Sequence, residues 1–257
     1  QSTSMPGYRW LGDPSSDTYS NLMYGLAIYY DLVAEGPYKK RVQEWVTKVT
    51  DRVIENDMRL VDIDGKMTLW GNYSPSLDKE KLNALLALYH LKIAYHVTGK
   101  ERYQDKYLEL IHEHGYDDDA IMAANFKPPY VPWDTYHFMK GSYILLKYET
   151  DLSLRNKYLA ALERFWLKEY PCKNLTLQIV YNHYVPDQGG FDEESIKQLI
   201  DWKGAWRQER EELMRKGNGS ELIKGTWIEP SHFYLLVYWK ARYHQLLTAE
   251  GKIGKGN

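Results

Sequence analysis

Cysteine is almost missing from this sequence, with Cys172 the single one among 257 residues. One cysteine excludes an internal disulfide and a multi-cysteine metal site. The sequence also lacks a run of about 20 apolar residues, so we expect no membrane span. With a formal net charge of -2 there is no electrostatic attraction to nucleic acid, which we do not expect as a partner.

Familiar cofactor and metal motifs are missing too. There is no Gly-rich phosphate loop, Gly-x-Ser-x-Gly elbow or His-Glu-x-x-His pair. His112 and His114 would lie on different faces of a helix, so they would not chelate together. Asp62-x-Asp64-Gly65 starts like a calcium loop but lacks the later ligands, and a hairpin turn explains it better. We therefore expect neither a metal nor a cofactor.

Phenylalanine is scarce, whereas tyrosine and tryptophan are abundant: 5 Phe stand against 23 Tyr and 9 Trp. Tyr and Trp combine an apolar body with a polar group, which suits wet concave surfaces such as sugar-binding clefts. Helical interfaces and cores with satisfied hydroxyls use them equally well. The chain starts at Gln1 without a basic and apolar leader, which a processed secreted or periplasmic protein or an excised fragment would share.

Apolar residues at helical spacing predict a series of helices joined by short turns. The predicted helices cover roughly 16–34, 38–57, 78–97, a fourth ending near 114, a fifth starting near 132, then 152–169, 172–184, 192–216 and 230–247. Alternation around Asp64-Gly65 predicts a small β-hairpin near 58–71. The run Asp117-Asp118-Asp119 is interpreted as a solvated loop and cap.

Three of the turns between these helices look alike. They contain Gly36-Pro-Tyr38, Gly99-Lys-Glu-Arg-Tyr103 and Leu154-Arg-Asn-Lys-Tyr158. The tyrosines are 65 and 55 residues apart, a period that indicates stacked helix pairs. The first helix of each pair is apolar nearly all round, as expected of an inner layer, and the second has a charged face, as expected of an outer layer.

Residues 10–31, from Trp10-Leu-Gly-Asp-Pro to Asp31, resemble a segment of uncharacterised bacterial proteins with an (α/α) toroid. Asp64-Gly-Lys-Met-Thr-Leu-Trp-Gly71 and Thr98-Gly-Lys-Glu-Arg-Tyr103 resemble them as well. This toroid is the fold of six-hairpin glycosidases and related polysaccharide lyases, so the resemblance implies a carbohydrate-active protein. Four helix pairs and one further helix predict an all-α, incomplete or truncated toroid. We expect a single domain over 1–257, possibly a fragment of a larger chain.

Inner helices that share one direction would bring their N-terminal ends to one rim. Asp-Thr-Tyr occurs twice, at 17–19 and 134–136, and each copy opens such a helix. The catalytic candidates at this rim are Asp17, Asp134, His137 and His232. The substrate-binding candidates are Asp13, Trp70, Asn72, Trp133, Tyr136, Trp227 and Glu229. An oligo- or polysaccharide is the expected partner.

Several roles remain open for these residues. Glycoside hydrolysis needs two carboxylates, and Asp17 with Asp134 is the best pair. Elimination from a uronate needs a base and a group that neutralises the carboxylate. The bases considered are Tyr136, His137, His232 and Tyr234, with Asn72 or Arg9 at the carboxylate. Helix capping is the simpler explanation for Asp13, Ser16 or Asp17. A non-catalytic scaffold that binds glycan or protein is the rival interpretation.

Overall fold

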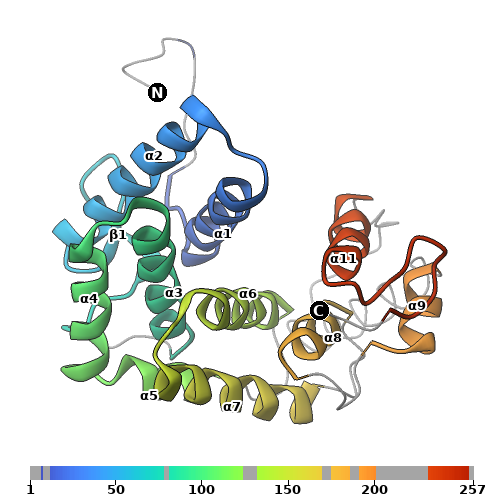
Figure 1. The fold of residues 1–257 in the computed structure, drawn as a ribbon. Helices are drawn as coiled ribbons and strands as arrows, with labels where there is room; N and C mark the ends of the chain where they lie inside the picture. Colours follow the sequence, from blue (N-terminus) through green and yellow to red (C-terminus); the bar gives the residue numbers. More distant parts are fainter. Residues whose placement is uncertain are drawn as a thin grey trace, which may run out of the picture. The chain divides into compact units, whose positions relative to one another are not determined.

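Helices dominate the part of the chain that the structure describes. This computed structural model describes residues 7, 12–77, 81–123, 132–169, 175–185, 191–200 and 231–254, coloured in Figure 1. These residues form ten α-helices and one two-stranded antiparallel sheet, which confirms the predicted helical class with a small β-hairpin. The chain divides into two units, Gln1–Ala123 with Lys140–Tyr158 and Ala124–Met139 with Leu159–Asn257.

The first unit contains two complete helix pairs. Its elements are α1 Ser16–Leu32, α2 Gly36–Glu55, β1 Arg59–Val61, β2 Met67–Asn72, α3 Lys81–Thr98, α4 Glu101–His112 and α5 Tyr116–Met122. The Ser15 hydroxyl caps α1 by accepting the Thr18 N–H at 3.4 Å. Gly99 adopts φ +67° between α3 and α4, a conformation that glycine reaches without strain.

Helix α3 is the centre of the first unit. It packs against α1, α2, α4 and α5, and most of its side chains are buried. The predicted inner position therefore holds for α3. It does not hold for α1, because Leu22, Tyr29 and Leu32 are exposed on it. Helix α1 is the first of the series and packs against α2 and α3, which leaves part of its surface to solvent.

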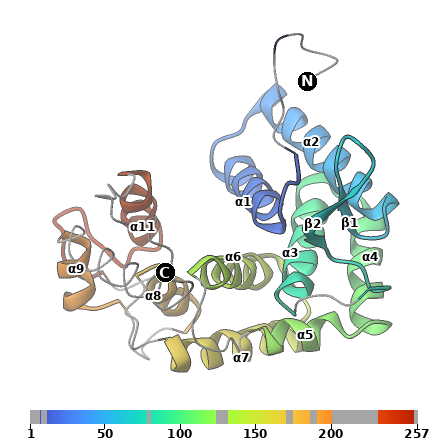
Figure 2. The ribbon, with the colours of Figure 1, turned by 180° about the vertical axis from the view of Figure 1, so that it is seen from behind.

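The β-hairpin forms where the sequence predicts it and lies beside α1 and α2 (Figure 2). Its turn is closed by the Asp62 N–H, which donates to the Lys66 carbonyl at 2.8 Å, and Gly65 adopts φ +81°. Asp13 fixes the hairpin to the start of α1. Its backbone N–H donates to Asp62 Oδ2 at 2.6 Å, and its Oδ1 accepts the Leu69 N–H at 2.7 Å.

The acidic run at 117–119 is helical, so its interpretation as a loop was wrong. Helix α5 begins at Tyr116, and the three aspartates occupy its first turn, where negative charge is stabilised by the helix dipole. Asp117 is buried and forms an ion pair with Lys157. The Tyr116 hydroxyl donates to the Tyr73 carbonyl at 2.6 Å and thereby anchors the short helix. These tertiary contacts have no signal in the local sequence.

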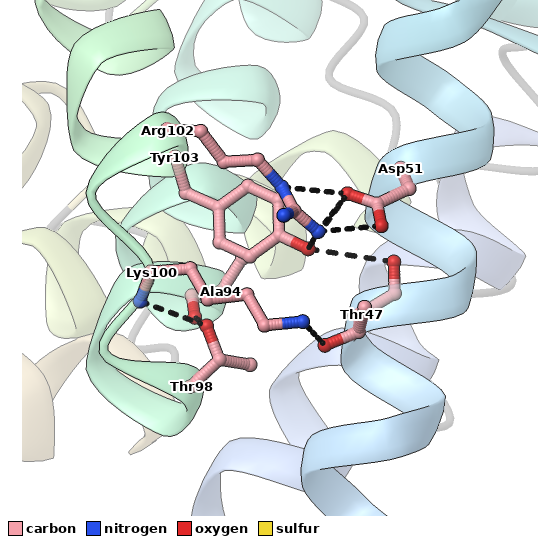
Figure 3. A network of polar contacts seen from close by, with 7 residues as sticks. All are labelled: Thr47, Asp51, Ala94, Thr98, Lys100, Arg102 and Tyr103. Carbon is pink, nitrogen blue, oxygen red and sulfur yellow. Dashed lines mark hydrogen bonds and ion pairs between the residues drawn. The ribbon is translucent and has the colours of Figure 1, made fainter.

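The recurring turn tyrosines dock each helix pair on the preceding one. Figure 3 shows the Tyr103 hydroxyl beside α2, where it donates to Asp51 at 2.8 Å. Arg102 binds both oxygens of the same carboxylate, at 2.8 and 2.6 Å from Nη2. Tyr158 likewise reaches α4, with its hydroxyl 2.7 Å from that of Tyr107. Tyr38, in the first pair, is 59% exposed.

The second unit is built from shorter helices. It contains α8 Leu175–Tyr184, α9 Glu193–Ile200 and α11 Ser231–Tyr243. Helices α6 Pro132–Tyr148 and α7 Leu152–Glu169 each run from one unit into the other. Its core consists of Leu175, Ile179, Phe191, Leu199, Val237, Ala241, Leu246 and Leu247. Trp166 stacks on Tyr181 with ring centroids 4.4 Å apart.

Candidate functional site

Asp17 lies in the first turn of α1, as predicted, and is partly buried. Ser15 caps this helix, so capping does not account for Asp17. Burial is the main cause that raises the pKa of Tyr89, and the negative charge of Asp17 adds to it. The same charge raises the pKa of Lys140, although burial lowers that pKa overall. The negative charge of Asp17 therefore acts on the pKa of a partly buried lysine and of a buried tyrosine.

The predicted binding residues on the hairpin have unequal roles. Asp13 is occupied by its two hydrogen bonds to the hairpin, which is a structural role. The side-chain oxygen of Asn72 accepts the Ser74 N–H at 3.0 Å, and its carbonyl accepts a hydrogen bond from Asn83. Trp70 is 62% exposed on β2. Of these three residues, Trp70 presents the most surface to a ligand.

The remaining predicted site residues that the structure describes lie in α6 and α11. Asp134 and Tyr136 are partly buried in the first turns of α6, and His137 is only 3% exposed. Trp133 lies in α6 and His232 in α11, but their side chains are outside the description. Trp227 and Glu229, as well as Arg9, lie outside the described residues altogether. The pairing of Asp17 with Asp134 stays a prediction.

A cluster that our sequence analysis did not predict joins the C-terminal ends of α1, α3 and α6. We call Asp31, His96, Lys147 and Tyr148 the Asp31 cluster. Asp31 Oδ1 lies 2.7 Å from His96 Nε2. Its Oδ2 accepts from Lys147 Nζ at 2.5 Å and from the Tyr148 hydroxyl at 2.8 Å. One carboxylate thus holds three ionisable side chains from two other helices.

These contacts fix the charge of Asp31. Burial would raise the pKa of its carboxyl group, but hydrogen bonds from Lys147, His96 and Tyr148 outweigh burial and lower it. The carboxylate is therefore ionised at neutral pH. Burial, followed by the Asp31 charge, raises the pKa of Tyr148, so this phenol keeps its proton. Because an ionised carboxylate can only accept hydrogen bonds, the proton in the Asp31–His96 hydrogen bond must be on His96 Nε2.

Two tyrosines contact the imidazole ring of His96. Tyr148 stacks on it with centroids 4.0 Å apart and an interplanar angle of 15°. Tyr30 meets it edge-on at 6.1 Å. Gln43 in turn donates to the Tyr30 hydroxyl at 3.3 Å and to the Val97 carbonyl at 3.0 Å. Because the His96 side chain is 36% exposed, a ligand can approach the oriented ring.

The Asp31 cluster has the composition of an acid–base centre. When His96 is neutral and donates from Nε2, its Nδ1 carries a lone pair that can accept a proton. A carboxylate that holds the other ring nitrogen stabilises the imidazolium that results. Lys147 supplies an adjacent positive charge, and its ammonium has three donors. This arrangement can remove a proton next to an anionic group.

A signal for this cluster was present in the sequence. Helices α1, α3 and α6 end in Tyr30-Asp31, Tyr95-His96 and Lys147-Tyr148, each a pair of aromatic or ionisable residues within the last turns. Helices that share one direction bring their C-terminal ends together as well as their N-terminal ends. Our prediction considered only the N-terminal rim, so it missed these residues.

No protein-family model, curated protein or solved structure matches this chain. Within the described ranges, no group of three or more His, Cys, Asp or Glu residues could hold a metal ion. None of the helices described here is long and apolar enough to cross a membrane. The site therefore has to be interpreted from its own geometry and chemistry.

Proposed function

We propose that this chain is a carbohydrate-active domain of the (α/α)-toroid type that cleaves a uronate-containing polysaccharide by elimination at the Asp31 cluster. The toroid is supported by the resemblance of residues 10–31, 64–71 and 98–103 and by the docking of successive helix pairs through Tyr103 and Tyr158. The reaction is supported by one observation above all, the Asp31–His96 hydrogen bond of 2.7 Å beside Lys147. A secreted or periplasmic location is part of this proposal.

In the proposed reaction, His96 Nδ1 takes the proton from C5 of the uronate. The C5–H electrons form the C4–C5 double bond, and the C4–O bond breaks. The departing oxygen takes a proton from solvent. Asp31 stabilises the imidazolium, while the free donors of Lys147 bind the uronate carboxylate and stabilise the charge that develops on it.

Elimination fits this cluster better than hydrolysis. A glycosidase needs two carboxyl groups, one of them protonated to act as the acid. The cluster contains one carboxylate, and its hydrogen bonds hold the pKa of Asp31 low. Hydrolysis by Asp17 and Asp134, the prediction made from the repeated Asp-Thr-Tyr, is the alternative chemistry for the same class of substrate.

The test is incubation with a panel of uronate polysaccharides, with detection of 4,5-unsaturated ends by ultraviolet absorbance and of all new reducing ends by a colorimetric assay. His96→Gln should lower the rate at least about 100-fold, the usual contribution of a general base. His112→Gln, at an exposed position on α4, is the matched control and should leave the rate unchanged.

Unsaturated ends that persist in His96→Gln would refute the role of His96. New reducing ends without unsaturation would instead indicate hydrolysis. In that case, Asp17→Asn and Asp134→Asn should abolish turnover while the helical circular dichroism signal is retained. The absence of any product from the whole panel would contradict the proposed enzymatic activity.

A non-catalytic binding role is supported by a different observation, the exposed apolar side chains of the first helix pair. Apolar side chains are exposed on the first helix pair, with Leu22, Tyr29 and Leu32 on α1 and Tyr38 and Trp45 on α2. Exposed apolar surface of this kind is a common feature of binding sites. A scaffold would bind glycan or protein without turnover, and Trp45→Ser would weaken that binding while His96→Gln would not.

A further inference from the structure

One face of helix α2 carries an exposed stripe of aromatic and basic side chains. Tyr38, Arg41, Trp45, Lys48 and Arg52 follow one another at spacings of three and four residues, which places them on the same face of the helix. All five are exposed, with Tyr38 at 59% and Trp45 at 46%. We call these five residues the α2 track, which extends along about 21 Å of helix.

The basic groups of the α2 track keep their hydrogen-bond donors available to a ligand. Among the residues that the structure describes, none of Arg41, Lys48 and Arg52 forms an ion pair or a side-chain hydrogen bond. The Arg41 guanidinium lies over the Trp45 ring at 5.2 Å. This cation–π contact holds the charge beside an aromatic surface and uses none of the guanidinium N–H donors.

The charge balance of this part of α2 is positive. Residues 36–48 contain four Lys or Arg and one Glu, in a chain whose formal net charge is -2. The acidic residues nearest the α2 track are Glu44 and Glu55, which lie along one border of it by their helical positions. The basic surface is therefore strongest in the first half of the helix, where both aromatic residues lie.

The start of α2 also contacts the surroundings of the Asp31 cluster. Lys39 Nζ lies 5.0 Å from the Tyr30 ring centroid, and Gln43 donates to the Tyr30 hydroxyl at 3.3 Å. The Tyr30 ring in turn meets His96 edge-on at 6.1 Å. Tyr38, the first residue of the α2 track, directly precedes Lys39 in the chain. A polymer bound at His96 can thus continue past Tyr30 onto the track.

We propose that the α2 track binds the sugar units of an acidic polysaccharide that follow the unit held at the Asp31 cluster. The substrate class in this proposal rests on the proposed function. Sugar rings have apolar faces that pack on the two aromatic side chains, while carboxylates pair with the three basic groups. Charge complementarity favours a uronate polymer over a neutral glycan, and the alternation of rings and cations favours it over an acidic protein segment.

Binding is measured by calorimetry with uronate oligosaccharides of increasing length, in the His96→Gln variant so that the ligand stays intact. Affinity should rise with length as the oligosaccharide covers the track. Arg41→Gln/Lys48→Gln should remove most of this rise and weaken the longest ligand up to about 25-fold, since an exposed ion pair contributes up to about fivefold. Lys40→Gln, exposed on α2 but outside the track, is the matched control and should bind like the parent.

The aromatic contribution is tested with Tyr38→Ser, whose fold is checked by circular dichroism. It should weaken the binding of oligouronates but not that of polyglutamate, an acidic polymer without sugar rings. Polyglutamate or single-stranded DNA bound as tightly as the oligouronates would overturn the proposal. So would a loss in Arg41→Gln/Lys48→Gln no larger than in Lys40→Gln, or the absence of binding to every uronate oligosaccharide.

The outcome is separable from that of the proposed elimination. With His96 intact, Arg41→Gln/Lys48→Gln should raise KM and leave kcat unchanged, because the track binds substrate and transition state alike. Binding that depends on Arg41 and Lys48 without any unsaturated product would support the track and refute the elimination. Unsaturated products formed by the double variant at the wild-type KM would support the elimination and refute the track.

Discussion

Lys92→Met is expected to destabilise the first unit strongly. Lys92 and Glu149 are buried, with side chains only 4% and 3% exposed, and their charged atoms lie 2.9 Å apart. Lys92 also lies over the Tyr107 ring at 4.4 Å and binds Gln104 at 3.2 Å. Methionine fills a similar volume without the charge, so the substitution mainly removes the partner of a buried carboxylate.

The size of the expected loss of unfolding free energy depends on the hydrogen bonds that Glu149 retains after the substitution. Removal of one partner from a buried ion pair costs about 3–5 kcal/mol, because an uncompensated charge remains. Glu149 still accepts from the Tyr107 hydroxyl at 2.6 Å and from the N–H groups of Thr150 and Asp151 at 2.8 and 2.9 Å. We therefore expect the lower end, about 3 kcal/mol.

Urea unfolding followed by circular dichroism measures this effect, as a shift of the transition that reports the first unit. In the double variant Lys92→Met/Glu149→Gln the buried charge is gone, and about 2 kcal/mol of the loss should be recovered. Lys106→Met is the control, since Lys106 pairs with Glu109 at 2.6 Å near the surface, where such a pair contributes about 0–1 kcal/mol. A loss in Lys92→Met no larger than in Lys106→Met, or no recovery in the double variant, would refute the reasoning.

Three further predictions concern stability. Tyr103→Phe should cost about 1 kcal/mol in urea unfolding, since the hydrogen bond to Asp51 is lost while the ring stays buried; a cost near zero would contradict the docking role. Gly71→Ala should cost about 1–3 kcal/mol or more, since an added Cβ would collide with Leu60, and wild-type stability would be inconsistent with this packing. Because the pKa of Asp31 is lowered by folding, its contribution to stability is present above the ordinary pKa of about 4 and is lost as the pH falls through the lower folded value. Thermal unfolding of Asp31→Asn between pH 2 and 6 should show a weaker acid dependence than the wild type.

Local sequence was sufficient for most of the helices. The apolar spacing and the capping serine predicted α1, and Asp64-Gly65 predicted the β-hairpin. The prediction for α7, 152–169, agrees with Leu152–Glu169 in the structure. These features depend on backbone propensity and on the period of apolar residues, which are properties of neighbouring residues in the chain.

Helix α5 and the buried Lys92–Glu149 pair could not be predicted in this way. Both depend on partners 40 to 57 residues away in the chain, and the local pattern around Asp117 resembles that of a solvated loop. Lys157 and Tyr73 hold α5 through contacts that exist only once the helix pairs have packed. Charge in a short segment indicates solvent exposure unless a distant partner compensates for the cost of burial.

The sequence by itself determined the helix pairs and their repeated turns. Only the tertiary structure decided which side chains meet. In the folded chain, Asp13 forms hydrogen bonds to the β-hairpin, and Lys140 donates a hydrogen bond to the side-chain amide of Asn21. The tertiary structure also brought His96 and Lys147 to the Asp31 carboxylate from two other helices. Secondary structure follows from local spacing, whereas a site of this kind requires side-chain atoms from distant segments to lie within about 3 Å of each other.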